Sequence, residues 1–331
     1  MHLTLLVPGL LWPREILRDT TFDLPLPALS QLLGRGRRAH FTGEEAWLAS
    51  VFGIAAPLPA ASLRLLGDGG DPAQHEWLCL DPVHWRVGDG AIVLDDPARL
   101  DLDADEDQAL RELVAPLFAH LGDIVAPAPG RWQLRLRQPA AIQTAPLPTA
   151  VGRQVDPALP AGDDGGSWRK LLAEAQPMLH AHRVNRQREA RGQPTANSLW
   201  PWGAGRLPTA APTGFRTFWG NDAVMRGLCS LEGIVVEPLP PGFTKVRGDV
   251  LARHDALLRS PPSDDAAGWR AALACIEEAW LAPALAAVNS SVLRRLTLVA
   301  CGHARGVHVT IGRGDLWRLW RKPVALAGLA P

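Results

Sequence analysis

Residues 168–208 read WRKLLAEAQPMLHAHRVNRQREARGQPTANSLWPWGAGRLP, and this stretch carries more structural information than any other part of the chain. Its first turns place apolar side chains on one helical face, and Pro177 must bend or split that helix. A polar, arginine-rich segment follows at 185–192. The run from Asn197 to Pro208 then holds two tryptophans, two prolines and two glycines, which excludes a regular helix there.

Outward from this stretch, apolar strand-like runs alternate with amphipathic helices. We expect strands at 3–7, 76–80, 91–94, 132–137, 296–300 and 307–311. We expect helices at 25–33, 107–121, 168–179, 223–232 and 269–280, the first of them ended by Gly34. This alternation favours an α/β fold with a central sheet and helices on its faces.

Turn-rich and proline-rich segments divide the chain. The GDGGDP run at 67–72 is a candidate boundary, and residues 139–166 are rich in proline and glycine with few periodic apolar positions. We therefore expect an α/β core from 1–74 and 165–331, an inserted small α+β unit at 75–140, and a Pro/Gly-rich linker at 141–164. An apolar cluster of Leu110, Leu113, Leu117 and the strand at Trp132 should hold the inserted unit together.

The composition excludes several classes of protein. The 331 residues hold 34 basic and 34 acidic side chains, a balance that argues against a strongly basic nucleic-acid binder. An uninterrupted apolar run of ~18 residues, as a spanning helix needs, does not occur. The four cysteines show no CxxC spacing and are typical of buried thiols in a reducing compartment. With few lysines and much Ala, Gly and Pro, the chain fits a GC-rich bacterial source. We expect a cytoplasmic protein with no nucleic-acid or membrane partner.

Two segments offer candidate ligand-binding residues. Glycines in the NSLWPWGAG run allow close approach of a ligand, and arginines bind carboxylate or phosphate bidentately. The candidates are Asp81, His84, Arg86, Asn185, Arg188, Asn197, Trp200, Trp202, Gly203 and Gly205. The structural alternatives stay open: a buried tryptophan-rich turn, an aspartate that starts a turn, a hydrogen-bonded histidine, and a solvated arginine face.

Motifs for phosphate or dinucleotide binding and for a catalytic serine are absent from the sequence. It has neither GxxxxGK[ST] nor GxGxxG nor GxSxG. Cys301, His303 and His308 cluster near the last strands, but a metal site would need further ligands. We therefore predict no cofactor and no metal ligands, with His303 as a possible remnant of a metal site.

The block at 168–208, together with WLCLDPVHWR at 77–86, resembles the proteobacterial RpfE-type regulatory proteins. These are similar to the archaeal-type cofactor-independent phosphoglycerate mutases. The resemblance implies an alkaline-phosphatase-like α/β core with a smaller inserted domain. In the mutases it also implies two divalent metals and a serine nucleophile that is transiently phosphorylated.

At the positions that should carry this chemistry, the sequence departs from the mutase pattern. The first strand ends Val7-Pro8-Gly9 instead of in an Asp-Gly metal motif, and residues 35–47 contain no serine. The late strand ends Ala300-Cys301-Gly302-His303 instead of in a GDH-like ligand motif, and the acidic ligand block downstream has no counterpart. We predict a catalytically degenerate protein that binds an unknown small molecule or protein. The alternatives are an active metal-dependent phosphoglycerate mutase or related phosphotransferase, and metal-free chemistry near Asn197 and Asp81.

Overall fold

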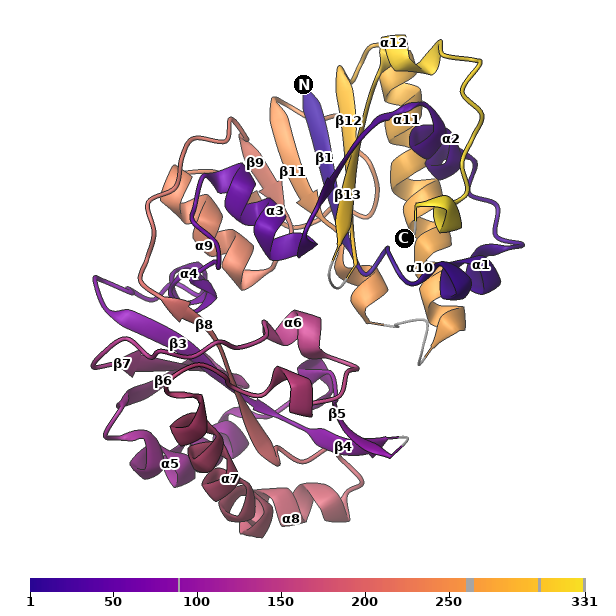
Figure 1. Cartoon of the computed structure of the whole chain (residues 1–331). Helices are drawn as coiled ribbons and strands as arrows, with labels where there is room; N and C mark the ends of the chain where they lie inside the picture. The colour runs from indigo at the N-terminus through magenta and orange to yellow at the C-terminus, as the bar shows by residue number, and fades with distance from the viewer. Residues whose placement is uncertain (89, 260–264, 303–304, 330–331) are drawn as a thin grey trace. The chain divides into compact units, whose positions relative to one another are not determined.

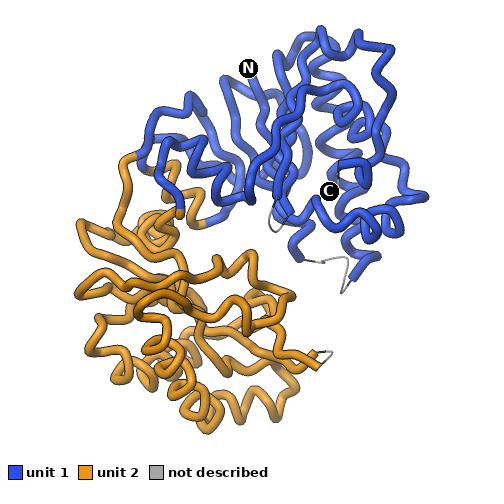
Figure 2. The backbone as a smooth tube through the Cα atoms, in the orientation of Figure 1, with its two compact units in different colours: residues 1–56, 210–222, 231–331 blue, residues 57–209, 223–230 orange. Residues whose placement is uncertain are grey.

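The computed structural model describes residues 1–88, 90–259, 265–302 and 305–329 of the chain. The backbone forms two compact units, each continuous in space but not in sequence (Figure 2). Unit 1 comprises Met1–Ala56, Ala210–Asp222 and Leu231–Pro331, and unit 2 comprises Pro57–Thr209 and Ala223–Ser230.

Unit 1 is built on a seven-stranded sheet with the strand order β10-β9-β11-β1-β12-β13-β2. The strands are β1 (His2–Pro8), β2 (Arg37–Phe41), β9 (Thr217–Trp219), β10 (Val235–Glu237), β11 (Asp249–Arg253), β12 (Arg295–Cys301) and β13 (Gly306–Gly312). The first five in the order run parallel, whereas β13 pairs antiparallel with both of its neighbours. Leu3 to Pro8 are all buried, as expected of a central strand covered on both faces.

Helices cover both faces of this sheet (Figure 1). They are α1 (Arg14–Thr21), α2 (Pro27–Arg35), α3 (Gly43–Phe52), α10 (Ala266–Ile276), α11 (Ala282–Asn289) and the short α12 (Arg313–Leu316). Helices α2, α10 and α11 lie on one face and α3 on the other (Figure 1). The core of unit 1 forms where apolar residues of β1 and β12 meet α2, α10 and α11.

One continuous helix, Ala266–Asn289, is long and apolar enough to cross a membrane by length and composition. This corrects our expectation that no segment of the chain would pass that test, which we based on an uninterrupted apolar run. Half of its most apolar window is buried inside the protein. Trp269, Leu273 and Trp280 belong to the core of unit 1, so burial within the fold accounts for the apolar face of this helix.

Gly34 does not end its helix as expected. Helix α2 continues to Arg35, and Gly36 follows in an extended conformation with φ −69°. A Cβ atom at residue 34 would come within 2.2 Å of the carbonyl oxygen of Lys322. The glycine therefore permits close approach of two backbone segments instead of a left-handed cap.

Unit 2 is an α+β structure around an antiparallel sheet with the order β6-β7-β3-β8. Its strands are β3 (Glu76–Val83), β6 (Gly122–Ala128), β7 (Arg131–Leu136), β8 (Ser198–Gly205) and the separate hairpin of β4 (Trp85–Gly88) and β5 (Ala91–Leu94). Its helices are α4 (Ala60–Gly67), α5 (Ala104–Phe118), α6 (Leu147–Ala150), α7 (Gly165–Ala181) and α8 (Arg183–Ala190). Helix α9 (Ala223–Glu232) belongs to unit 2 over its first eight residues.

Helix α5 forms for reasons that are visible in the sequence. Asp103 and Glu106 make a reciprocal capping box at its start, and acidic residues occupy its first turn. Leu110 is buried with Trp132 of β7 in one cluster, as predicted, whereas Leu113 and Leu117 pack against that cluster and are only partly buried.

The limits of the smaller unit differ from those expected from the sequence. Strand β8 pairs with β3 along Val83 to Trp77, so the region from 165 to 209 lies in unit 2, as do residues 57–74, and not with residues 1–56. The proline-rich segment 141–164 is not a free linker, because Leu147 and Val155 are buried in a cluster with Trp200 and Trp202. The GDGGDP run lies within unit 2, where Arg131 pairs with Asp68 at 2.9 Å.

Candidate functional site

Asp81, a predicted ligand-binding residue, is instead the centre of a buried polar network in unit 2. Its carboxylate accepts two hydrogen bonds from Arg64, at 2.7 and 2.8 Å. It also accepts from the backbone amide of Trp132 at 3.1 Å and from the Trp202 indole at 2.8 Å. Burial by itself lowers the pKa of Arg64, but the adjacent carboxylate more than offsets this, so the pKa is raised and the guanidinium stays charged. With 1 % of its surface exposed, Asp81 has no face left for a ligand.

Asn185 and Arg188 of α8 are buried as well, each 2 % exposed. The Asn185 amide nitrogen donates to the carbonyl oxygens of Leu179 and Ala196, both at 2.8 Å, and so ties α7 to the segment between α8 and β8. Arg188 donates to Glu106 and to the backbone carbonyls of Leu100 and Pro194. Asn185 and Arg188 of the arginine-rich segment therefore hold parts of unit 2 together through internal hydrogen bonds.

The space beside Gly203 and Gly205 is filled by other residues of the protein. A Cβ at Gly203 would lie 2.7 Å from the Ala60 Cβ, and one at Gly205 would lie 2.7 Å from the Pro59 Cβ. The register of β8 against β3 shifts here, and Gly203 has φ +64°, which is the backbone of a β-bulge. Trp200 is buried and donates its indole N–H to the Ala145 carbonyl. In the structure this segment is therefore a buried, tryptophan-rich strand end, which was the structural alternative to a ligand-binding loop.

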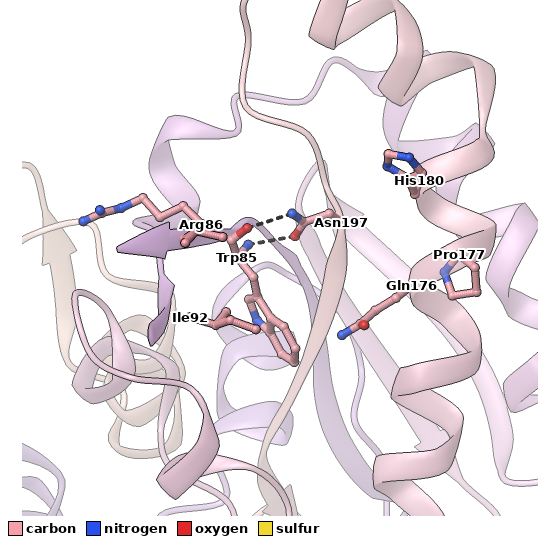
Figure 3. Close-up of a pocket in the computed structure, with 8 residues that line it drawn as sticks. Trp85, Arg86, Ile92, Gln176, Pro177, His180 and Asn197 are labelled. Atoms are coloured by element: carbon pink, nitrogen blue, oxygen red, sulfur yellow. Dashed lines mark hydrogen bonds between the residues drawn. The ribbon is translucent and has the colours of Figure 1, made fainter. Parts of the chain in front are cut away.

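Three other candidates, His84, Arg86 and Asn197, lie together at the start of the β4–β5 hairpin. Asn197 fixes this point by accepting from the backbone amide of Trp85 at 2.7 Å and donating to its carbonyl at 2.8 Å (Figure 3). His84 bonds through Nδ1 to the Thr195 carbonyl at 2.8 Å. The side chains of Asn197 and His84 therefore set the position of the hairpin.

An open pocket of about 410 Å³ lies between this hairpin and α7. Its lining residues are Trp85, Arg86, Val87, Ile92, Gln176, Pro177, His180 and Asn197. Figure 3 shows Trp85 between Ile92 and the helix that carries Gln176 and His180, with Arg86 extending away from that helix. The indole nitrogen of Trp85 is buried and has no hydrogen-bond partner among the described residues.

Arg86 carries the permanent positive charge among the described residues that line this pocket. Its side chain is 40 % exposed, with Nε 3.9 Å from the Asp95 carboxylate. Asp95 is closer to Arg99, at 3.3 Å, and does not line the pocket. The guanidinium of Arg86 therefore retains donors for a carboxylate or phosphate group. Sequence reasoning found Arg86 and Asn197 but missed Trp85, Gln176 and His180, because three separate segments bring them together.

The second place to look for a site is the edge of the unit 1 sheet where the parallel strands end. Ligands of open α/β sheets bind beyond this edge. Here β1 ends at Pro8, β11 at Arg253 and β12 at Cys301, and Glu44 stands in the first turn of α3 just after β2.

Arg253 dominates the charges at this edge. Its side chain is 6 % exposed and pairs with Glu44 through Nη1 and with Asp255 through Nε, the latter at 2.7 Å. One fixed cation therefore already pairs with both carboxylates and offsets one of their two negative charges. The sequence signal for this site was the polar run Arg253-His254-Asp255 directly after an apolar strand, and we did not single it out.

Neighbouring groups at this edge fit a metal ion poorly. Burial raises the pKa of the Cys301 thiol to about 12, more than nearby Arg253 lowers it, so the thiol stays protonated near neutral pH. Burial lowers the pKa of His254, whose Nδ1 has no partner in the described structure and whose ring packs edge-on against Trp280. Across the described ranges, no group of three or more His, Cys, Asp or Glu side chains is placed to hold a metal. The candidate remnant His303 lies outside the described residues.

Comparison with solved structures identifies the fold. The cofactor-independent phosphoglycerate mutase of Thermoplasma acidophilum aligns over 99 % of this chain and 94 % of its own, with a TM-score of 0.50 at 16 % identity. A Pyrococcus horikoshii protein aligns over 98 % of this chain and 91 % of its own, with a TM-score of 0.52 at 14 % identity. The large sheet flanked by helices is the alkaline-phosphatase-like α/β fold of these proteins, as expected from the sequence.

Sequence comparison points to the same group of proteins. The 2,3-bisphosphoglycerate-independent phosphoglycerate mutase of Methanosarcina barkeri is 32 % identical over 98 residues, which is 29 % of this chain and 24 % of that enzyme. The corresponding enzymes of Methanothrix thermoacetophila and Methanopyrus kandleri are 33 % and 34 % identical over 87 and 93 residues. No protein-family model matches the chain. The chain is thus homologous to these mutases over a segment that spans about a quarter of their length.

Proposed function

We propose that this chain is a catalytically inactive, phosphoglycerate-mutase-like protein with a regulatory or ligand-binding role, of the RpfE type in a bacterial cytoplasm. One observation carries the proposal: Arg253 occupies the space between Glu44 and Asp255 at the edge where ligands of this fold class bind. A divalent cation held by the same carboxylates would face the charge of a nearly buried guanidinium. Such a repulsion is strong where water is excluded.

The proposal follows from how phosphoryl transfer is catalysed. Metals held by anionic ligands neutralise charge on the transferring group, and a nucleophile must stand beside them. An arginine already neutralised by two carboxylates offers neither a Lewis acid nor a free cation. Free cysteines at positions 79, 229, 275 and 301 suit the cytoplasmic location.

Metal analysis combined with an activity assay tests the first half of the proposal. We expect the wild-type protein, loaded with manganese or zinc and desalted, to retain no stoichiometric metal by mass spectrometry. It should also fail to interconvert 2- and 3-phosphoglycerate in a coupled assay. Two equivalents of metal with turnover that a chelator abolishes would instead support the alternative, an active metal-dependent mutase.

A variant of Arg253 sharpens this test. Arg253→Gln releases Glu44 and Asp255, so we expect manganese to raise the melting temperature of this variant while leaving the wild type unchanged. Arg135→Gln is the matched control, because it also removes an arginine from an aspartate, Asp123, but at an exposed site. A manganese response in the wild type equal to that of Arg253→Gln would contradict the proposed role of Arg253.

The ligand-binding half of the proposal rests on the pocket at the β4–β5 hairpin. Small carboxylates or phosphates are the ligand class that Arg86 favours, and 3-phosphoglycerate and inorganic phosphate are the first probes. Loss of a charged hydrogen bond of ~1.5–3 kcal/mol predicts that Arg86→Gln weakens binding by roughly 10- to 100-fold. Arg99→Gln is the control, since Arg99 pairs with the same Asp95 but does not line the pocket. Equal losses in both variants, or binding mapped elsewhere by NMR, would reject this placement.

A further inference from the structure

A turn at one edge of unit 1 carries a concentration of exposed apolar surface that neither candidate site uses. Trp317, Leu319 and Trp320 are 65, 69 and 77 % exposed, although large apolar side chains are normally buried. They follow directly after α12, within four residues of one another. Contiguous exposed apolar surface of this kind marks an interaction site.

The exposure is imposed by the way in which the turn is attached. Its leading end is fixed because Leu316 is buried and Arg35 donates to the Leu316 carbonyl at 2.8 Å. Its trailing end is fixed by the amide of Val324, which donates to the Ser30 carbonyl at 3.0 Å. Lys322 packs through its backbone against Gly34 of α2. With both ends held on the surface of α2, the apolar tips between them project outward.

Basic residues adjoin these tips in the sequence and on the edge strand of the sheet. Within the turn and the residue after it, Arg318, Arg321 and Lys322 alternate with the apolar residues. Arg37 and Arg38 stand on β2, the edge strand of the sheet, and burial and then the nearby charge of Arg321 lower the pKa of Arg38. We call this set the basic–aromatic patch: Arg37, Arg38, Trp317, Arg318, Leu319, Trp320, Arg321 and Lys322. Its acidic neighbour Asp315 is buried and pairs with two members of the patch, Arg318 at 3.1 Å and Arg37 at 3.9 Å. One carboxylate offsets only one of the five basic side chains, so the patch remains cationic.

We propose that the basic–aromatic patch binds the surface of a lipid bilayer that contains anionic lipids. Tryptophan and leucine side chains gain free energy in the interfacial region, and adjacent arginines and lysines are attracted to the negative surface potential. Single-stranded nucleic acid would also attract arginine and tryptophan. Leu319 decides between the two, because an aliphatic side chain gains from insertion among lipids but offers no ring for base stacking.

This proposal revises the expectation of no membrane partner, which concerned spanning segments. Peripheral binding needs only a surface, and it does not depend on the proposed loss of catalysis. The charge balance of zero for the whole chain hides the patch, because its cations are separated by almost 300 positions in the sequence. Only the pairing of β2 with β13 brings Arg37 and Arg38 beside the turn that follows β13.

Vesicle sedimentation of the full chain tests the proposal. We expect binding to vesicles of phosphatidylglycerol mixed with phosphatidylcholine, no binding to phosphatidylcholine alone, and loss of binding as salt shortens the Debye length from about 10 Å to about 3 Å. The double variant Arg321→Glu with Lys322→Glu should bind at least tenfold more weakly, since one cation contributes roughly fivefold. Trp317→Ala with Trp320→Ala should lower binding by a similar or larger factor.

Matched controls exist in the same unit. Val235→Ala removes an apolar side chain, 56 % exposed, from β10 at the opposite edge of the sheet, and Lys245→Glu reverses an exposed charge between β10 and β11. Both controls should bind vesicles like the wild type, and all variants should keep its melting temperature, because every substituted side chain is exposed.

Several results would overturn the proposal. These are no binding to anionic vesicles, equal binding to neutral ones, or equal losses in the controls. Binding of an oligothymidylate that the patch variants weaken, without vesicle binding, would assign the patch to nucleic acid. A dimer in gel filtration that the tryptophan variant dissociates, again without vesicle binding, would assign it to self-association.

Discussion

Replacing Asp81 by alanine should lower the free energy of unfolding of unit 2 by about 3–5 kcal/mol, because it breaks a buried ion pair and leaves its partner unpaired. The structure supports a value in this range. The Arg64 and Asp81 side chains are 6 % and 1 % exposed, so water does not replace the lost carboxylate. Two further donors, the Trp132 amide and the Trp202 indole, lose their acceptor at the same time.

Urea unfolding followed by tryptophan fluorescence and circular dichroism measures this loss. Since the chain has two units, the transition of unit 2 must be fitted separately. Asp163→Ala, an exposed aspartate of the same unit, is the control and should change stability by less than about 0.5 kcal/mol. Arg64→Met combined with Asp81→Leu should cost less than the sum of the single changes, because the pair is then replaced by apolar volume.

The outcome also separates a structural Asp81 from a ligand-binding one. An aspartate held for a ligand would be neutral or unfavourable for stability, so its removal would leave unfolding unchanged. If Asp81→Ala and Asp163→Ala unfold at the same urea concentration, the assignment of Asp81 to the internal network is refuted.

Three further predictions follow from the same structure. Glu277→Ala removes a buried carboxylate that accepts from the first amides of α2, so it should cost about 1–2 kcal/mol. Burial raises the pKa of Glu277 more than the backbone hydrogen bonds lower it, so the native state binds the Glu277 proton more tightly than the unfolded state does. The stability that comes from protonated Glu277 therefore falls as pH rises above about 4.3, the usual pKa of glutamate. The pH–stability profile of Glu277→Ala should lack that decline. Leu110→Ala should cost roughly 2–5 kcal/mol and Leu113→Ala clearly less, as thermal unfolding can measure, since only Leu110 is completely buried. Iodoacetamide at neutral pH should label exposed Cys275 in the native protein and spare Cys301, whose pKa burial raises to about 12, and mass spectrometry of labelled peptides would expose the opposite pattern.

The local pattern of the sequence determined most of the secondary structure. A continuous apolar run predicted β1, and period-two and period-3.6 apolar spacing predicted β7, α5 and α7, because the order of apolar side chains along the chain decides which face an element buries. The expected start of α5 at residue 107 was three residues late, because the capping box of Asp103 and Glu106 starts the helix at Ala104. The resemblance of two short blocks gave the fold class, which the solved relatives bear out.

Tertiary structure alone decided what the polar residues do. An arginine and an aspartate 17 positions apart, Arg64 and Asp81, form one buried pair, and their meeting depends on the packing of α4 against β3. Likewise Arg253 reaches Glu44 across 209 positions, and β2 reaches the turn after α12 through β13. Sequence spacing predicts only contacts within a helix or hairpin, whereas a side chain's burial and partners are set by segments distant in sequence. The physical reason is that solvation and pairing of a charge depend on all atoms within a few ångströms, and only the folded chain brings those atoms together.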